Sequence, residues 1–188
     1  MNADRKICII SKKLDLTQKF LYMAKITLEG KPINTNGSLP SVGKKAPDFK
    51  LIDQELKTHR LEDFTGKKVV LNIFPSVDTR ICADSVRTFN KEAADLQNVV
   101  VLNISRDLPF SFKAFCSQEK IDRVFTLSEF RDSNFSDAYQ VLIMDGTFEG
   151  LMSRAIVIID EEGRVNYTEQ VPEIAQDPNF DEALKQLK

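Results

Sequence analysis

The chain has 188 residues, of which 42% are hydrophobic, so it is long enough to bury the core of one domain. Its 26 basic and 28 acidic residues nearly cancel and form no block of one sign, which argues against nucleic acid or an anionic membrane as a partner. The longest apolar runs are far shorter than the roughly 18 residues of a membrane span, so we expect no transmembrane helix.

The cysteines and the histidine limit the metal and redox chemistry. Cys8, Cys82 and Cys116 are odd in number and too far apart for the disulfide framework of a small secreted domain. A reducing compartment, and hence the cytoplasm, is the expected location. The single histidine, His59, is interpreted as a solvated strand or turn residue, and the chain has no C-x-x-C motif. We therefore expect no zinc site, no cofactor and no thioredoxin-type dithiol.

Residues 1–22 precede a second methionine, Met23, and differ in character from the rest of the chain. Their apolar piece, residues 7–10, is shorter than the about 7 to 15 residues of a signal peptide's apolar region, and their acidic residues argue against an organelle transit peptide. We expect an N-terminal extension, either a functional arm or the product of a start codon placed too early. One domain is expected over residues 23–188.

The domain opens with a pattern typical of a β-hairpin: a short strand from Ile26, a turn at residues 29–32 and a second short strand. Apolar, strand-like runs come next at residues 49–52, 68–74, 99–105 and 155–160. Helical patterns lie between and after them, at residues 112–120 and 134–142 and in a terminal helix that starts at Asp177-Pro178. Alternating strands and helices predict an α/β fold with helices on both faces of a sheet.

Cys82 stands where another helix is expected to begin. Apolar residues follow it at spacings of four and three, at Val86, Phe89, Ala93 and Leu96, which places them on one helical face. The cysteine therefore lies beside free backbone N–H groups and the positive end of the helix dipole. Such a position favours a thiolate over a thiol, especially with a guanidinium nearby.

Pro75 and Thr79 form a P-x-x-x-T-x-x-C motif with Cys82. Proline ends the preceding strand, because it cannot donate to the hydrogen-bond ladder. The threonine hydroxyl can donate to a thiolate and accept from a bound hydroxyl group. The motif suits a small protic oxidant. By itself, however, a packed cysteine, a capping threonine and a strand-ending proline explain it equally well.

Several motifs in order resemble the thiol peroxidase branch of the atypical two-cysteine peroxiredoxins: LNIFPSVDTRICADSVRTFN, NVVVLNISRDLPF, KAFC, TLSEFR and AIVIIDEEGRV. The resemblance runs from about Ile26 to Lys188. It implies a thioredoxin-like fold with a central mixed sheet, helices on both faces and an N-terminal β-hairpin. It also implies a homodimeric enzyme that reduces hydrogen peroxide and organic hydroperoxides to water and alcohols and is recycled by thioredoxin.

The resemblance assigns roles to individual residues. Cys82 matches the peroxidatic cysteine, which attacks the O–O bond and becomes a sulfenic acid, and Thr79 and Pro75 match its active-site partners. Arg131 matches the family arginine, and a guanidinium is able to hold a thiolate and to polarise the leaving oxygen. Three other arginines are interpreted as surface salt-bridge residues: Arg80, Arg87 and Arg154.

Cys116 matches the resolving cysteine of this branch, which implies an intramolecular disulfide with Cys82. Other peroxiredoxins place the second thiol about one helical turn after the first, where this chain has Arg87, or near the C-terminus, where it has none. From the residues alone, Cys116 fits a small core residue better, since it lies one turn after Phe112. A disulfide needs Cα atoms within about 7 Å, so its formation is expected to require local unravelling. Cys8 matches nothing in the family and receives no role.

A second hypothesis is a redox sensor or binding module of the same fold that relays oxidation to a partner protein. The cysteines alone do not separate it from a peroxidase. Turnover with thioredoxin, thioredoxin reductase and a hydroperoxide does, because a relay without its partner stops after one equivalent. A dithiol oxidoreductase is disfavoured by the missing C-x-x-C motif.

Overall fold

The computed structural model describes residues 24–92 and 96–187, so the extension predicted at residues 1–22 lies outside the described residues. The described part begins with a hairpin of two antiparallel strands, β1 (Lys25–Leu28) and β2 (Lys31–Asn34). Glu29 and Gly30 at its tip both have positive φ, 52° and 76°, as a tight two-residue hairpin turn requires. The predicted hairpin is confirmed.

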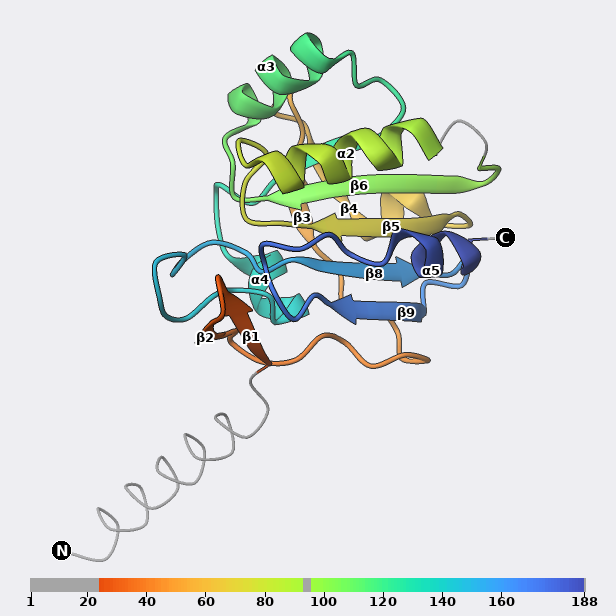
Figure 1. Cartoon of the computed structure of the whole chain (residues 1–188). Coiled ribbons are helices and arrows are strands. Elements are labelled where there is room, and N and C mark those ends of the chain that lie inside the picture. The colour runs from red at the N-terminus through yellow and green to blue at the C-terminus, as the bar shows by residue number, and fades with distance from the viewer. Residues whose placement is uncertain (1–23, 93–95, 188) are drawn as a thin grey trace, which may run out of the picture.

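A seven-stranded mixed sheet forms the centre of the domain (Figure 1). Its strands, from one edge to the other, are β4 (Thr58–Arg60), β3 (Lys50–Ile52), β7 (Phe125–Ser128), β6 (Val99–Ser105), β5 (Lys68–Ile73), β8 (Ala155–Ile159) and β9 (Val165–Gln170). The central strands β5, β6 and β7 are parallel, and β8 runs antiparallel to β5. The carboxyl ends of the three parallel strands therefore lie at the same end of the sheet as the start of β8.

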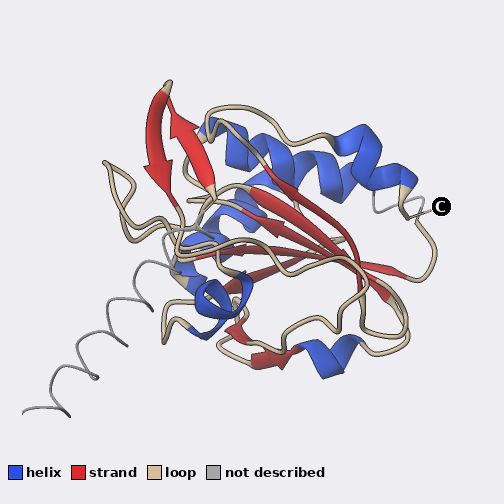
Figure 2. Ribbon diagram, turned by 90° about the horizontal axis from the view of Figure 1, so that it is seen from below, coloured by secondary structure: helices blue, strands red, loops and turns tan. Residues whose placement is uncertain are grey.

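Helices cover both faces of this sheet, as predicted (Figure 2). One face carries α2 (Arg80–Glu92), α3 (Pro109–Glu119) and α5 (Phe180–Lys185). The other carries α4 (Asn134–Tyr139) and the short 3-10 helix η1 (Leu61–Phe64).

Strand β5 shows how the sequence builds a core on each face. Val69, Leu71 and Ile73 pack on the α4 side, whereas Val70 packs with α2 and α5, because successive side chains of a strand point to opposite faces. A strand buried on both faces is a continuous apolar run, and this is why β5 was predictable from the sequence.

A buried hydrogen-bond network fixes α2 on the sheet. The Asn72 amide in β5 donates to Asn103 Oδ1 in β6 at 2.7 Å, and Ser85 Oγ in α2 donates to Asn72 Oδ1 at 2.9 Å. Asn103 Nδ2 in turn donates to the Phe125 carbonyl oxygen in β7 at 3.1 Å. Buried polar groups require partners, so Ser85 sets the position of α2 one turn after Cys82.

The predicted strands at residues 49–52, 68–74, 99–105 and 155–160 are confirmed to within one residue at each end. The helix expected to start near Cys82 begins at Arg80, and α2 is described to Glu92; residues 93–95 lie outside the described part. Strands β4, β7 and β9 were not predicted.

Three helix boundaries and one environment differ from expectation. The helix predicted at 112–120 begins three residues earlier, at Pro109, because proline suits the first position of a helix. The helix predicted at 134–142 ends at Tyr139, where Gln140 turns left-handed with φ 59°. The terminal helix begins at Phe180 instead of at Pro178, because Asn179 caps it and accepts a hydrogen bond from Glu182 N at 3.0 Å. His59 is buried rather than solvated, with its Nε2 2.8 Å from Asp53 Oδ2.

Candidate active site

The loop between β5 and α2 carries the predicted motif. Pro75 is buried directly after β5, and residues 75–79 lead into α2 at the carboxyl edge of the parallel strands. The carbonyl oxygen of Ser76 lies 3.1 Å from both the amide and the hydroxyl of Thr79, and Ala83 N donates to the Thr79 carbonyl oxygen at 2.9 Å. These contacts form the first turn of α2 and place Cys82 within it.

The Cys82 thiol is enclosed and has two polar neighbours. The side chain has 0% exposure, and its Sγ lies 2.8 Å from Thr79 Oγ1 and 3.3 Å from Arg154 Nη2. Thr79 has a single hydroxyl proton, which it can direct either to the sulfur or to the Ser76 carbonyl. A hydroxyl and a guanidinium therefore both face the sulfur.

Arg154 is held at the sulfur by the backbone opposite it. Its Nε donates to the Ile174 carbonyl oxygen at 2.9 Å, and the residue is 2% exposed. Within residues 24–92 and 96–187 it forms no ion pair with a carboxylate, and its Nη1 is buried without a hydrogen-bond partner. A buried guanidinium is permanently charged, and the polar side-chain atom it contacts is the Cys82 sulfur.

Sheet topology explains why Arg154 meets Cys82. The two residues are far apart in the sequence, but β8 is antiparallel to β5 and pairs Ala155 with Ile73. Arg154, the residue before β8, thus lies at the same end of the sheet as the loop after β5. A lone charged residue immediately before an all-apolar strand is the sequence signal, and sequence reasoning misread it as a surface salt-bridge residue.

The structure corrects the expected position of Arg131. Its side chain is exposed, and its guanidinium carbon lies 5.4 Å from the centre of the Phe130 ring. It lines a small pocket after β7 together with Glu129 and Asp132, and neither Thr79 nor Arg154, the polar neighbours of Cys82, lines that pocket. The guanidinium beside the thiol belongs to Arg154, because the residues after β7 are separated from the β8 edge by β6 and β5.

Arg87 and Arg80 form the surface ion pairs that were expected. Arg87 Nη1 lies 2.7 Å from Asp84 Oδ1, and its Nε lies 2.9 Å from Glu119 Oε2 in α3. Arg80 Nη1 lies 3.8 Å from Asp84 Oδ2. The Arg87 guanidinium lowers the pKa of Glu119, and this exposed pair links α2 to α3.

A pocket of about 220 Å³ has Thr79 and Arg154, the two polar neighbours of Cys82, in its wall, whereas the buried Cys82 itself does not line it. Its apolar lining comes from Leu28, Pro75, Ile81, Phe148, Ile174 and Ala175. Leu28 belongs to the N-terminal hairpin, and Ile174 belongs to the segment that holds Arg154. The pocket thus offers polar groups at the sulfur and an apolar wall beyond it.

Glu173 fastens the hairpin to this pocket. Its carboxylate accepts from Thr27 Oγ1 at 2.7 Å and from the amides of Glu29, Gly30 and Ala175 at 3.0 Å each. The amides of Ala175 and Gly30 lower the pKa of Glu173 to about 2. The Glu173 carboxylate therefore connects the hairpin tip to the segment whose Ile174 carbonyl oxygen holds Arg154.

Cys116 lies in a separate environment on α3. It is 5% exposed, and its Sγ lies 3.9 Å from Thr126 Oγ1 in β7. Burial raises the pKa of the Cys116 thiol. Cys82 and Cys116 are both free thiols. Arg154, which contacts Cys82, precedes β8, and Thr126, which contacts Cys116, lies in β7, with β6 and β5 between these two strands.

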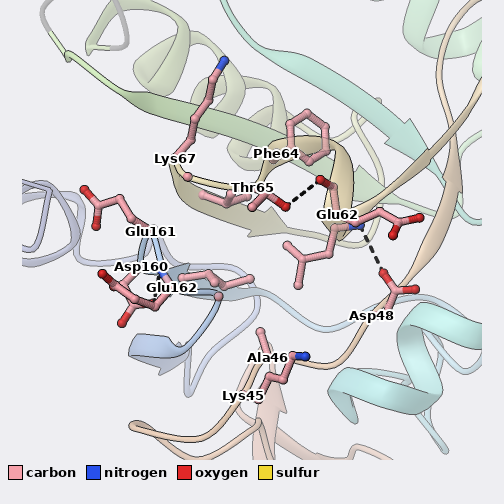
Figure 3. Close-up of a pocket in the computed structure, with 15 residues that line it drawn as sticks. Lys45, Ala46, Asp48, Glu62, Phe64, Thr65, Lys67, Asp160, Glu161 and Glu162 are labelled. Atoms are coloured by element: carbon pink, nitrogen blue, oxygen red, sulfur yellow. Dashed lines mark hydrogen bonds between the residues drawn. The ribbon is translucent and has the colours of Figure 1, made fainter.

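A larger cavity of about 540 Å³ lies at the opposite end of the strands β5 and β8 from Cys82 (Figure 3). Residues 65–67, before β5, and residues 160–163, after β8, line it, and it contains no cysteine. Figure 3 shows side chains of both charges around it, such as Lys67 and Glu161. This cavity is larger than the pocket lined by Thr79 and Arg154, but neither cysteine lines it.

The part of the chain that the structure describes contains no group of three or more His, Cys, Asp or Glu side chains placed to hold a metal ion. It also contains no helix with the length and apolar character needed to cross a membrane.

Comparisons with known proteins identify the family. A family model described as Redoxin matches residues 41–184. Over 165 residues, which are 88% of this chain and 99% of each relative, the chain is 53% identical to a thiol peroxidase of Mycobacterium tuberculosis and 46% identical to one of Corynebacterium glutamicum.

Solved structures confirm the predicted thioredoxin-like fold. A peroxiredoxin-like protein from Aquifex aeolicus is 35% identical, with a TM-score of 0.83 over 88% of this chain and 97% of that one. A thiol peroxidase from Chromobacterium violaceum, at 23% identity and a TM-score of 0.78 over 87% and 94% of the two chains, shares the fold. The chain therefore belongs to the Redoxin family and, within it, to the thiol peroxidases.

Proposed function

We propose that this peroxidase reduces hydroperoxides through a Cys82 sulfenic acid and a disulfide between Cys82 and Cys116, and that thioredoxin recycles it. The observation that carries the proposal is the buried Arg154 guanidinium. One of its nitrogens contacts Cys82 Sγ, another is buried without a partner, and the residue lines the pocket.

The unpartnered Nη1 supports a role beyond holding the thiolate. An unsatisfied buried donor costs roughly 1–3 kcal/mol, more for a charged group, so it is expected to serve a ligand. A peroxide oxygen in the pocket would accept from it while the other oxygen faces the sulfur. The guanidinium then stabilises both the attacking thiolate and the charge that develops on the leaving oxygen. This role is assigned to Arg154 in place of Arg131.

In the first step, two electrons pass from the Cys82 sulfur to the hydroperoxide. The Cys82 thiolate attacks one oxygen of the hydroperoxide, an S–O bond forms and the O–O bond breaks. The sulfur becomes a sulfenic acid, and the leaving alkoxide or hydroxide takes up a proton to give an alcohol or water. Thr79 donates to the thiolate before the attack and can accept from the bound hydroperoxide.

The second step uses Cys116. Its thiol attacks the sulfenic sulfur, an S–S bond forms and water leaves. The pKa of the Cys116 thiol is raised by burial, so the thiol is protonated and enclosed before the first step. Cys82 Sγ contacts Arg154, the residue before β8, and Cys116 Sγ contacts Thr126 in β7, with β6 and β5 between these two strands. We therefore expect parts of α2 and α3 to move before the bond closes.

The resemblance to two-cysteine peroxiredoxins supports the remaining parts of the proposal: thioredoxin as the dithiol that reduces the disulfide, a homodimer, and a cytoplasmic location. The pocket supports the substrate class. Its apolar wall fits the carbon part of an organic hydroperoxide, and its polar end accommodates hydrogen peroxide as well.

Coupled turnover tests the proposal. Reduced protein, thioredoxin, thioredoxin reductase and NADPH are mixed with hydrogen peroxide or cumene hydroperoxide, and NADPH oxidation is followed. We expect many equivalents to be consumed by the native chain and none above background by Cys82→Ser. If consumption stops after one equivalent although the disulfide is reduced by dithiothreitol, the protein is a relay for another partner and thioredoxin recycling is wrong.

A further inference from the structure

We propose that Asp107 is a positioning residue that latches the Cys82 loop onto the start of α3, and that this latch must open before the disulfide forms. The inference rests on the proposed two-cysteine cycle and adds a residue to it. Asp107 lies in the ISRDLPF stretch between β6 and α3, to which the mechanism so far gives no role.

The Asp107 carboxylate collects three donors with short contacts. Oδ1 accepts from Ser76 Oγ at 2.7 Å, and Oδ2 accepts from Val77 N and from Ser105 Oγ, also at 2.7 Å each. Ser76 and Val77 belong to the loop between β5 and α2, whereas Ser105 ends β6. Asp presents two acceptor oxygens to these donors, whereas Asn would place an NH2 group, which cannot accept, at one of the two positions.

The latched loop sets the position of Thr79. The Ser76 carbonyl accepts from both the Thr79 amide and its hydroxyl at 3.1 Å, and the same hydroxyl lies 2.8 Å from Cys82 Sγ. Asp107 touches neither the sulfur nor the pocket. It acts on the thiol through Ser76 and Thr79, along a path of three hydrogen bonds.

The other end of the latch is the helix that carries Cys116. Pro109 begins α3 two residues after Asp107, and the Asp107 carbonyl oxygen accepts from Ser128 Oγ at the end of β7. One turn before Cys116, Phe112 has 0% exposure and packs in the same apolar cluster as Cys82. Asp107 is thus the polar link between the two segments that must separate and rejoin when the disulfide forms.

Two opposite effects are expected from this position. While the latch is closed, it keeps Thr79 at the sulfur and favours attack on peroxide. It also keeps the two cysteines apart and slows the attack of Cys116 on the sulfenic acid. Weakening the latch is therefore expected to slow the first step and to speed the second, a pattern that loss of overall stability does not produce.

The test compares Asp107→Asn with Asp78→Asn, in the full chain. The control removes the same charge from the Cys82 loop that Asp107 contacts, and the Asp78 side chain is exposed and makes no hydrogen bond or ion pair with the described residues. Hydrogen exchange of the reduced proteins is measured first, because it requires no catalysis. We expect the Val77 amide to exchange about tenfold faster in Asp107→Asn, with the effect confined to residues 76–79 and 107–112.

Stopped-flow kinetics then separate the two steps. We expect the second-order rate constant with peroxide to fall about tenfold in Asp107→Asn, and disulfide formation to become about threefold faster, with less sulfinic acid under excess peroxide. Asp78→Asn should match the native chain in both. Ser76→Ala, which keeps Asp107 and loses one contact, should move both rates in the same directions by less.

The possible failures are distinguishable. If the native chain does not form the disulfide, the two-cysteine cycle fails, while exchange at Val77 still reports on the latch. If the native chain cycles but exchange at Val77 is unchanged in Asp107→Asn, rises equally throughout the chain, or is accompanied by slower disulfide formation, the latch is wrong. Where Asp107→Asn does not fold, Ser76→Ala decides by the same measurements.

Discussion

At the scale of single residues, Arg154 and Arg131 are a natural pair for comparison, because one guanidinium lies at the thiol and the other on the surface. Arg154→Lys should lower the second-order rate constant of Cys82 with peroxide by about 100-fold, since an ammonium cannot contact the sulfur, the Ile174 carbonyl and the peroxide with one planar group. Arg131→Lys should leave it within about twofold. Stopped-flow measurement with both variants checks this, and the reverse ranking would return the catalytic role to Arg131.

These residues also show which part of the site is visible in sequence. Pro75, Thr79 and Cys82 lie within eight residues, so local rules about strand ends and helix starts place them together. Arg154 comes from a distant segment and reaches the site because β8 runs antiparallel to β5. No local pattern encodes that pairing. The motif that contains Arg131 places its arginine after β7, which β6 and β5 separate from β8. Cys116 was visible through family resemblance, whereas its residue pattern indicated a core position.

At the scale of elements, the attachment of α2 to the sheet depends on Ser85. This side chain is fully buried and donates to Asn72 Oδ1, which has no substitute donor if the hydroxyl is removed. Ser85→Ala should reduce the free energy of unfolding by about 1–3 kcal/mol. Ser117→Ala, on the exposed face of α3, should change it by less than about 0.5 kcal/mol. Urea titration measures both, and equal small effects would show that the network does not stabilise α2.

The hairpin contact should depend on pH through Glu173. Its pKa is lowered from 4.5 to about 2, so the ionised form favours the folded contact. This stabilisation is present above the pKa of the unfolded chain, near 4.3, and is lost as pH falls toward 2. The difference in unfolding free energy between the native chain and Glu173→Gln should therefore be largest above about pH 5 and shrink at pH 3.

Glu149→Gln provides the control for that experiment, because the Glu149 side chain is exposed and unpaired among the described residues. Its difference from the native chain should not change between pH 5 and pH 3. A constant difference for Glu173→Gln as well would contradict the assignment of the hairpin clamp to the Glu173 carboxylate.

Prediction of elements succeeded where one physical signal dominated. The strands β5, β6 and β8 are buried on both faces and appear as apolar runs, whereas β9, with the sequence VNYTEQ, is a partly exposed edge strand whose composition does not stand out. Strands β4 and β7 are short, and their pairing partners decide them. The terminal helix was misplaced because both Pro178 and Asn179 are helix-start residues, and the Asn179 cap is the one that forms.

At the scale of the whole molecule, all site residues lie within residues 24–187, and the relatives align over 165 residues. We predict that a chain beginning at Met23 folds and turns over hydroperoxide within about twofold of the full chain, because residues 24–187 contain the sheet, the pocket, Cys82 and Cys116. Coupled turnover and thermal unfolding of the two chains measure this. A large loss of activity or melting temperature would assign a role to residues 1–22.

The central claim is that Cys82 and Cys116 form the catalytic disulfide, and mass analysis after oxidation tests it most directly. With one equivalent of hydroperoxide, the native chain should lose two hydrogen atoms in mass, and peptide mapping should show a crosslink between Cys82 and Cys116 with Cys8 free. Cys116→Ser should instead gain one oxygen on Cys82, and a second with excess peroxide. A crosslink between Cys82 and Cys8, or normal cycling of Cys116→Ser with thioredoxin, would contradict the mechanism.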